Sequence, residues 1–254
     1  MSLTTLISSD YDRSARLKPA LLVSLPFALA IVSIFSDISE MHLLIGIVTY
    51  FGLTALIAQL GRDEGKRLEP WLFEHWGGKP TTQILRHRNS YLDINTKARY
   101  HRTLSSLLPN LPMPSDTTEK NNPTAADAVY ESCAQYLRER TRDKRDFPLV
   151  HAENVNYGFR RNLWGMKKAG IVISICSLIA TLLVTYLRSE SGMPYSLPAT
   201  ASLISAWMLV WWLLRIKPSW VRVTAFAYAE RLIATCDTFP SSNSTKSSII
   251  TSAN

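Results

Sequence analysis

The sequence predicts an all-α membrane protein with two transmembrane helical hairpins, four helices in all, flanking a helical cytoplasmic domain. Apolar residues gather in four blocks, each free of Lys, Arg, Asp and Glu and each close to the length that crosses a bilayer. Short turns join the blocks in pairs, and 27 of the 28 Lys and Arg residues fall outside those turns. The blocks are Ala20 to Phe35, His42 to Leu60, Ala169 to Leu187 and Tyr195 to Leu214.

These blocks divide the chain into five segments. Both termini and the central loop carry the cations, whereas the two outer turns carry only Arg188. The positive-inside bias therefore predicts a multi-pass protein with both termini in the cytoplasm. A cleaved signal peptide is the alternative for the first block, but a second apolar block follows within a few residues. The segments are a cytoplasmic N-terminal segment (1–19), the first hairpin (20–60), the cytoplasmic helical domain (61–168), the second hairpin (169–214) and an amphipathic helix with a disordered tail (215–254).

Cations and tryptophans border the second hairpin. Charged side chains cannot enter hydrocarbon, so the cations ahead of the third block mark the membrane surface. Anionic headgroups would attract each of them by about 1 kcal/mol. Tryptophans at the same level are typical of the aromatic belt. This membrane-interface set comprises Arg160, Arg161, Trp164, Lys167, Lys168, Trp211 and Trp212.

Four hydroxyl residues in the third block fall on one helical stripe. Their spacings of three, four and four residues place them on one face. Such a stripe forms either a seam where helices pack closely or, in an oligomer, the wall of a pore. Both interpretations remain open from the sequence. The hydroxyl stripe consists of Ser174, Ser177, Thr181 and Thr185.

The central loop carries a net charge of +6 and a second group of cations far from the predicted membrane. Its segments show helical periodicity, and the polar stretch from Pro109 to Pro123 is expected to be a mobile linker. Arginine side chains bind phosphate groups and acidic protein surfaces well, so we expect a ligand or partner to bind here. The predicted binding group is Arg86, His87, Arg88, Arg99 and Arg102.

No motif in the sequence indicates an enzyme. It contains no phosphate-binding Gly-x-x-x-x-Gly-Lys loop, nucleophile elbow or dinucleotide fingerprint. The histidines and the three cysteines lack metal-ligand spacing, so we expect neither a metal nor another cofactor. Arg145 and His151 are spaced somewhat like a helical ribonuclease signature, but Pro148 separates them.

Four motifs in the central loop resemble a family of uncharacterised bacterial membrane proteins. They are LEPWL at 68–72, WGGKPTTQILRHR at 76–88, YHR at 100–102 and YGFRRN at 157–162. The layout of two hairpins around a helical domain is also similar to that of the four-helix membrane effectors of bacterial anti-phage systems. These resemblances imply a location in the bacterial inner membrane.

Together, these features predict a non-enzymatic inner-membrane effector of anti-phage defence. Its cytoplasmic domain would receive a signal, and its membrane helices would then perturb or permeabilise the bilayer. The alternative is a non-pore membrane anchor or sensor subunit that recruits a cytosolic partner enzyme. The expected partners are the lipid bilayer, further copies of the chain in a homo-oligomer, and the product of a neighbouring gene or a nucleotide signal.

Overall fold

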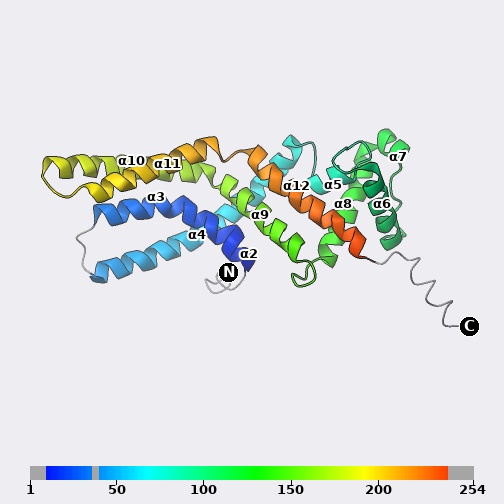
Figure 1. The fold of residues 1–254 in the computed structure, drawn as a ribbon, viewed down its shortest axis with the longest axis horizontal. Coiled ribbons are helices and arrows are strands. Elements are labelled where there is room, and N and C mark those ends of the chain that lie inside the picture. The colour runs from blue at the N-terminus through cyan, green and yellow to red at the C-terminus, as the bar shows by residue number, and fades with distance from the viewer. Residues whose placement is uncertain (1–9, 36–39, 240–254) are drawn as a thin grey trace, which may run out of the picture. The chain divides into compact units, whose positions relative to one another are not determined.

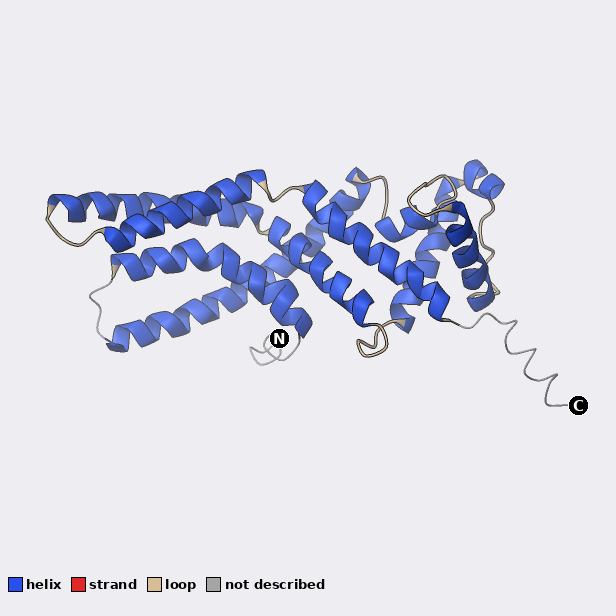
Figure 2. Cartoon of the chain, in the orientation of Figure 1, coloured by secondary structure: helices blue, strands red, loops and turns tan. Residues whose placement is uncertain are grey.

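The computed structural model describes residues 10–35 and 40–239, without the side chains at 10, 40–45 and 47–49. Every regular element in this part of the chain is a helix (Figure 2), as the sequence predicts. The chain forms two compact units, and each is described by itself. Unit 1 comprises Met1–Pro70 and Val155–Val221, and unit 2 comprises Trp71–Asn154 and Arg222–Asn254. The unit boundaries fall within helices α4 (Glu40–His75), α9 (Pro148–Gly165) and α12 (Pro218–Ala234).

Unit 1 is a bundle of long helices. Helix α3 packs against both α10 and α11, and α10 and α11 pack along each other as an antiparallel pair (Figure 1). A short α2 and a π-helix, η1, lead into α3. The bounds of these elements are Asp10–Asp12 for α2, Arg13–Leu17 for η1, Lys18–Ile34 for α3, Lys167–Glu190 for α10 and Ser196–Leu214 for α11.

Three helical segments in the described residues are long and apolar enough to cross a membrane, namely Arg13–Ile34, Lys167–Glu190 and Ser196–Leu214. The fourth expected span, from His42 to Leu60, falls within α4, where the side chains at 42–45 and 47–49 lie outside the description. The structure therefore supports an all-helical chain with three candidate spans, compatible with a multi-pass membrane protein. The arrangement of four spans in two hairpins stays a prediction.

On the candidate spans, many large apolar side chains face outward and several small or hydroxyl side chains face inward. On α10, Ile179 and Leu183 are exposed, whereas Ser174 and Thr181 are fully buried. The same division holds on α11, where Leu203 is exposed and Ser202 and Ser205 are buried. A bundle in water would do the reverse, because exposed apolar surface costs free energy there. The arrangement fits a hydrocarbon environment, where close packing and interhelical hydrogen bonds hold helices together.

Unit 2 has its own apolar core. Tyr130 and Leu137 of α8 pack with Ile84 of α5, Leu104 of α6 and Leu232 of α12, and all five are fully buried. Helices α5 and α7 both contact α8, and the short 3-10 helix η2 contacts α6. The bounds are Pro80–Leu85 for α5, Ile94–Leu107 for α6, Asp116–Asn121 for α7, Pro123–Arg140 for α8 and Thr235–Thr238 for η2.

One local expectation differs from the structure. The stretch expected to be a linker contains α7, because Ser115 caps this helix and Glu119 is buried within unit 2. The cap of α8 is Asn122, with Pro123 at the first turn. The amphipathic segment after the fourth block contributes its residues from Arg222 onward to the core of unit 2. The disordered tail predicted beyond 239 lies outside the described residues.

Glycine allows α10 and α11 to approach closely. A β-carbon at Gly170 would overlap the indole ring of the fully buried Trp212. We expect Gly170→Ala to lower the free energy of unfolding by about 1–3 kcal/mol, because overpacking forces side chains or backbone to shift. The measurement is thermal unfolding of the full chain in detergent.

Gly52→Ala is the matched control, since a β-carbon at Gly52 would meet nothing within 4 Å. This variant should unfold close to the temperature of the parent protein. Equal destabilisation by both substitutions would contradict the proposed role of the α10–α11 contact.

Candidate functional sites

The predicted binding group is largely engaged inside unit 2. The guanidinium of Arg86 forms a two-pronged ion pair with Asp127, with N–O distances of 2.8 and 2.6 Å, and its Nη1 donates to the carbonyl of Gly77 at 2.8 Å. Arg99 forms a similar pair with Asp237, with distances of 2.7 and 3.0 Å. Two of the four arginines in the group therefore already hold carboxylates.

The other three members differ from one another. The ring Nε2 of His87 lies 2.9 Å from the carbonyl oxygen of Pro114, and the Nε of Arg88 lies 3.8 Å from a carboxylate oxygen of Glu119. Arg102 is exposed and has no side-chain partner among the described residues. The five residues thus do not form one free cationic surface.

A buried lysine and a buried glutamate hold the loop that follows α5. The Nζ of Lys97, a residue only 6% exposed, donates to the carbonyls of Arg86, His87 and Asn89. The carboxylate of Glu119 accepts from the backbone N–H of His87 and the hydroxyl of Tyr130, each at 2.8 Å. Together these two ions hold the loop through its backbone groups. Nothing in the sequence marked either residue, because their partners are mainly backbone groups distant along the chain.

The membrane-interface set is divided between surface and interior positions. Arg160 stacks over the ring of Trp220, 4.7 Å from its centroid, and also donates to its carbonyl at 2.9 Å. Lys167 donates to the carbonyl of Ile216 at 2.7 Å, and Lys168 is exposed. Trp164 and Trp211 are half-buried. These five residues have surface available for a headgroup region.

Arg161 and Trp212 differ from the expected interface role, because both side chains lie within the packing of unit 1. Arg161 is 5% exposed and its Nη1 pairs with the carboxylate of Glu69 at 2.9 Å, while Trp212 is fully buried. Tyr157 donates its hydroxyl to the same carboxylate oxygen at 2.6 Å. Burial alone would lower the pKa of Arg161, but the adjacent Glu69 carboxylate raises it, so the guanidinium stays charged.

The ion pair continues into the start of α3 through Asn162. The amide of Asn162 accepts from Arg161 and donates to the backbone carbonyl of Ala15 at 2.7 Å. Ala15 lies in the π-helix η1, where the wider turn changes the backbone hydrogen-bond pattern. A continuous polar network therefore links α4, α9 and η1, and these segments hold together without exposing a charge.

The hydroxyl stripe lies in the packing of unit 1. Ser174, Ser177 and Thr181 are buried, and Thr185 is half-buried. The Oγ of Ser202 on α11 donates to the Oγ1 of Thr181 at 2.8 Å. The hydroxyls of Ser174, Thr181 and Thr185 each donate to a carbonyl one turn back on α10. In this conformation the stripe has the geometry of a packing seam.

Replacing Glu69 by Gln should strongly destabilise unit 1. The substitution leaves the buried Arg161 charge without its carboxylate, a loss of about 3–5 kcal/mol of unfolding free energy. Chemical denaturation in detergent, followed by tryptophan fluorescence, measures the change. Glu64→Gln is the control on the same helix, because Glu64 pairs with Arg67 at the surface and should contribute at most about 1 kcal/mol. Similar losses in both variants would contradict the importance of burial.

Acidification should release the loop held by Glu119. Burial alone would raise the pKa of Glu119, but hydrogen bonds from His87 N–H, the Tyr130 hydroxyl and Arg88 N–H lower it below the usual 4.5. The stabilisation is therefore present above pH 4.5 and is lost as the pH falls through the lower folded-state pKa. Hydrogen exchange of the His87 and Arg88 amides should accelerate in that range. Glu119→Gln should remove this pH dependence, whereas Glu139→Gln should preserve it.

Among the described residues, no group of three or more His, Cys, Asp and Glu side chains is arranged to hold a metal ion. No protein-family model matches the sequence, and no curated protein or solved structure matches the chain.

Proposed function

We propose that this chain is a multi-pass membrane protein that anchors a helical sensor domain, and that this domain recruits a cytosolic partner after receiving a signal. The main support for the proposal is that the candidate spans expose large apolar side chains and bury hydroxyl side chains. Ile179 and Leu183 face outward on α10, whereas Ser174 and Thr181 face the packed interior. Lipid is the solvent that favours this division.

A non-pore role fits the present packing better than a channel does. Thr181 is bonded to Ser202 of the neighbouring helix and to its own backbone, so its hydroxyl is not available to water. The segment from Ala169 to Leu187 contains no Asp, Glu, Lys or Arg that could relay protons or sense voltage. Unit 2 has a separate core and could serve as the domain that binds the partner.

In this proposal the segment from His42 to Leu60 is a fourth span, which completes two hairpins. The bias of 27 of 28 cations then assigns both termini and the central segment to the cytoplasmic side. The bacterial inner membrane is the compartment implied by the sequence resemblance. The protein would have no catalytic activity of its own, and the partner enzyme would be encoded by a neighbouring gene.

The second candidate is a membrane-perturbing effector of anti-phage defence. One observation favours it: Ser205 Oγ and Trp212 Nε1 are buried in α11 and have no hydrogen-bond partner within the described residues. Buried polar groups usually find partners, so these two would gain from a rearranged or oligomeric state. A signal that binds this second state more tightly would shift the population toward it.

Membrane potential distinguishes the two candidates. Cells that express the full chain with its neighbouring genes should keep their potential after phage challenge if the chain is an anchor and sensor. A voltage-sensitive dye provides the measurement, and membrane fractionation checks that the chain is inserted. Depolarisation before lysis would overturn the first proposal and support the effector.

The hydroxyl stripe provides a local test. Replacing Ser177 and Thr181 by Leu should mainly lower the stability of the bundle, since bulky side chains disrupt the contact between α10 and α11. Thr200→Leu is the control, because Thr200 is exposed and bonds only within α11. If the effector is correct, the double variant should abolish depolarisation while still inserting.

A further inference from the structure

Cations from two parts of the chain meet in unit 1 where α9 leads into α10 and α11 leads into α12. The Nζ of Lys167, the first residue of α10, donates to the carbonyl of Ile216 at 2.7 Å. The Nη1 of Arg160 donates to the carbonyl of Trp220 at 2.9 Å. Both cations therefore lie beside the connection 215–217, which carries two further cations of its own.

An apolar cluster holds this region in place. Trp212 and Ile216 are fully buried in it, and Trp211 and Trp220 pack against it partly buried. The ring of Trp220 lies 6.4 Å from that of Trp211, and it carries the guanidinium of Arg160 at 4.7 Å from its centroid. The carbonyls that accept from the two cations therefore belong to packed segments rather than to a free loop.

The cations gathered here have no carboxylate on their own helices. Residues 154–189 and 191–229 contain neither Asp nor Glu. The side chains of Lys168, Arg215 and Lys217 are exposed, and none of them forms an ion pair within the described part of the chain. This region of unit 1 therefore carries positive charge that an anion from outside the protein can neutralise.

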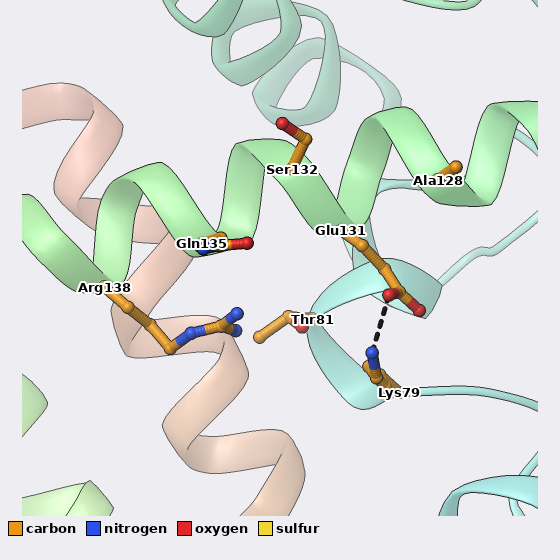
Figure 3. A pocket seen from close by; sticks show the side chains of 7 residues that line it. All are labelled: Lys79, Thr81, Ala128, Glu131, Ser132, Gln135 and Arg138. Atoms are coloured by element: carbon orange, nitrogen blue, oxygen red, sulfur yellow. Dashed lines mark hydrogen bonds and ion pairs between the residues drawn. The ribbon is translucent and has the colours of Figure 1, made fainter.

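Several cations of unit 2 are instead already neutralised. Arg86 holds the carboxylate of Asp127. In a hollow along one side of α8, the Nζ of Lys79 lies 2.6 Å from a carboxylate oxygen of Glu131 (Figure 3). An anion that bound to either cation would have to displace a carboxylate first.

Exposed apolar side chains lie directly next to the uncancelled cations. Leu213 and Leu214 are 49% and 66% exposed, and Arg215 follows them in the chain. A phospholipid matches this combination, because its phosphate is joined to acyl chains. A soluble phosphate would leave both leucines in contact with water, which costs free energy. Basic clusters beside a membrane helix are typical of contacts with anionic headgroups, and tryptophans are enriched at the same level.

We propose that this region binds the headgroup of an anionic phospholipid, whose acyl chain covers Leu213 and Leu214. We call it the junction site, and it consists of Arg160, Lys167, Lys168, Arg215, Lys217, Trp211 and Trp220. The predicted membrane-interface set lacked Arg215, Lys217 and Trp220, which the fold brings to Lys167 and Arg160. The junction site rests on the membrane location in the proposed function and adds a preference for one class of lipid.

Native mass spectrometry of the full chain in a maltoside detergent tests the junction site. The probes are dioctanoyl phosphatidylglycerol, dioctanoyl phosphatidylcholine and glycerol 3-phosphate. Phosphatidylglycerol should bind about tenfold or more tightly than phosphatidylcholine, which has the same acyl chains but no net charge. Arg215→Gln and Lys217→Gln should each weaken its binding about fivefold, the factor that one cation beside the membrane contributes to the attraction of an anionic headgroup.

Arg102→Gln is the matched control. It removes the same charge from an exposed arginine of unit 2, so the binding of phosphatidylglycerol should be unchanged. Circular dichroism checks that each variant is folded. Arg215→Gln and Lys217→Gln should both pass, because these side chains are exposed and hold no carboxylate of the described chain.

Three results would overturn the junction site: equal affinities for the two lipids, equal losses in Arg215→Gln and Arg102→Gln, or full competition by an equal concentration of glycerol 3-phosphate. The last result would assign the cations to a soluble phosphate. Membrane fractionation tests the proposed function separately. A chain absent from the membrane fraction would contradict that function, whereas an inserted chain without a preference for phosphatidylglycerol would contradict the junction site alone.

Discussion

The close approach of helices at small and hydroxyl residues is the constraint on which unit 1 depends. Between helices surrounded by hydrocarbon there is no hydrophobic driving force, so short contacts and hydrogen bonds must supply the association free energy. The chain meets this requirement at Gly170 against Trp212 and at Thr181 against Ser202. A further contact joins α3 to α4, where the Ser24 hydroxyl lies 3.0 Å from the Tyr50 hydroxyl. The outer surface is then free to carry large apolar side chains such as Ile179 and Leu203.

The polar network at the end of the bundle follows the same logic with charged groups. Glu69 and Arg161 are too polar to lie against hydrocarbon, and each satisfies the other beneath Tyr157. Gly65 and Gly165 allow α4 and α9 to come close enough for this pairing, because a β-carbon at Gly165 would lie 2.6 Å from the backbone nitrogen of Gly65. Small residues and buried ions therefore support each other at this junction.

The sequence predicts the parts of the fold that depend on local pattern. Apolar length identified three helices that are long and apolar enough to cross a membrane, and helical periodicity identified an all-helical unit 2. The stripe of hydroxyls was also recognisable, since its period is that of the helix itself. The pairing of Arg86 with Asp127, 41 residues away, could not be recognised from the sequence. Periodicity indicates which face of a helix a residue occupies but not its distant partner. For the same reason, the sequence does not show that Arg161 is buried while its neighbour Arg160 is partly exposed.

Because the sequence does not reveal distant partners, it also does not show which charged side chains are free to bind a ligand. The net charge of the central loop suggested a broad cationic surface, yet a positive total does not say which cations are available. Arg86 and Arg99 hold carboxylates, and Lys97 is surrounded by carbonyls. Each of these cations stabilises the fold by cancelling a nearby negative charge or dipole, and a ligand would have to displace that partner to use it. The cations that can bind a ligand at the lowest cost are those that the fold leaves uncommitted, such as the exposed Arg102.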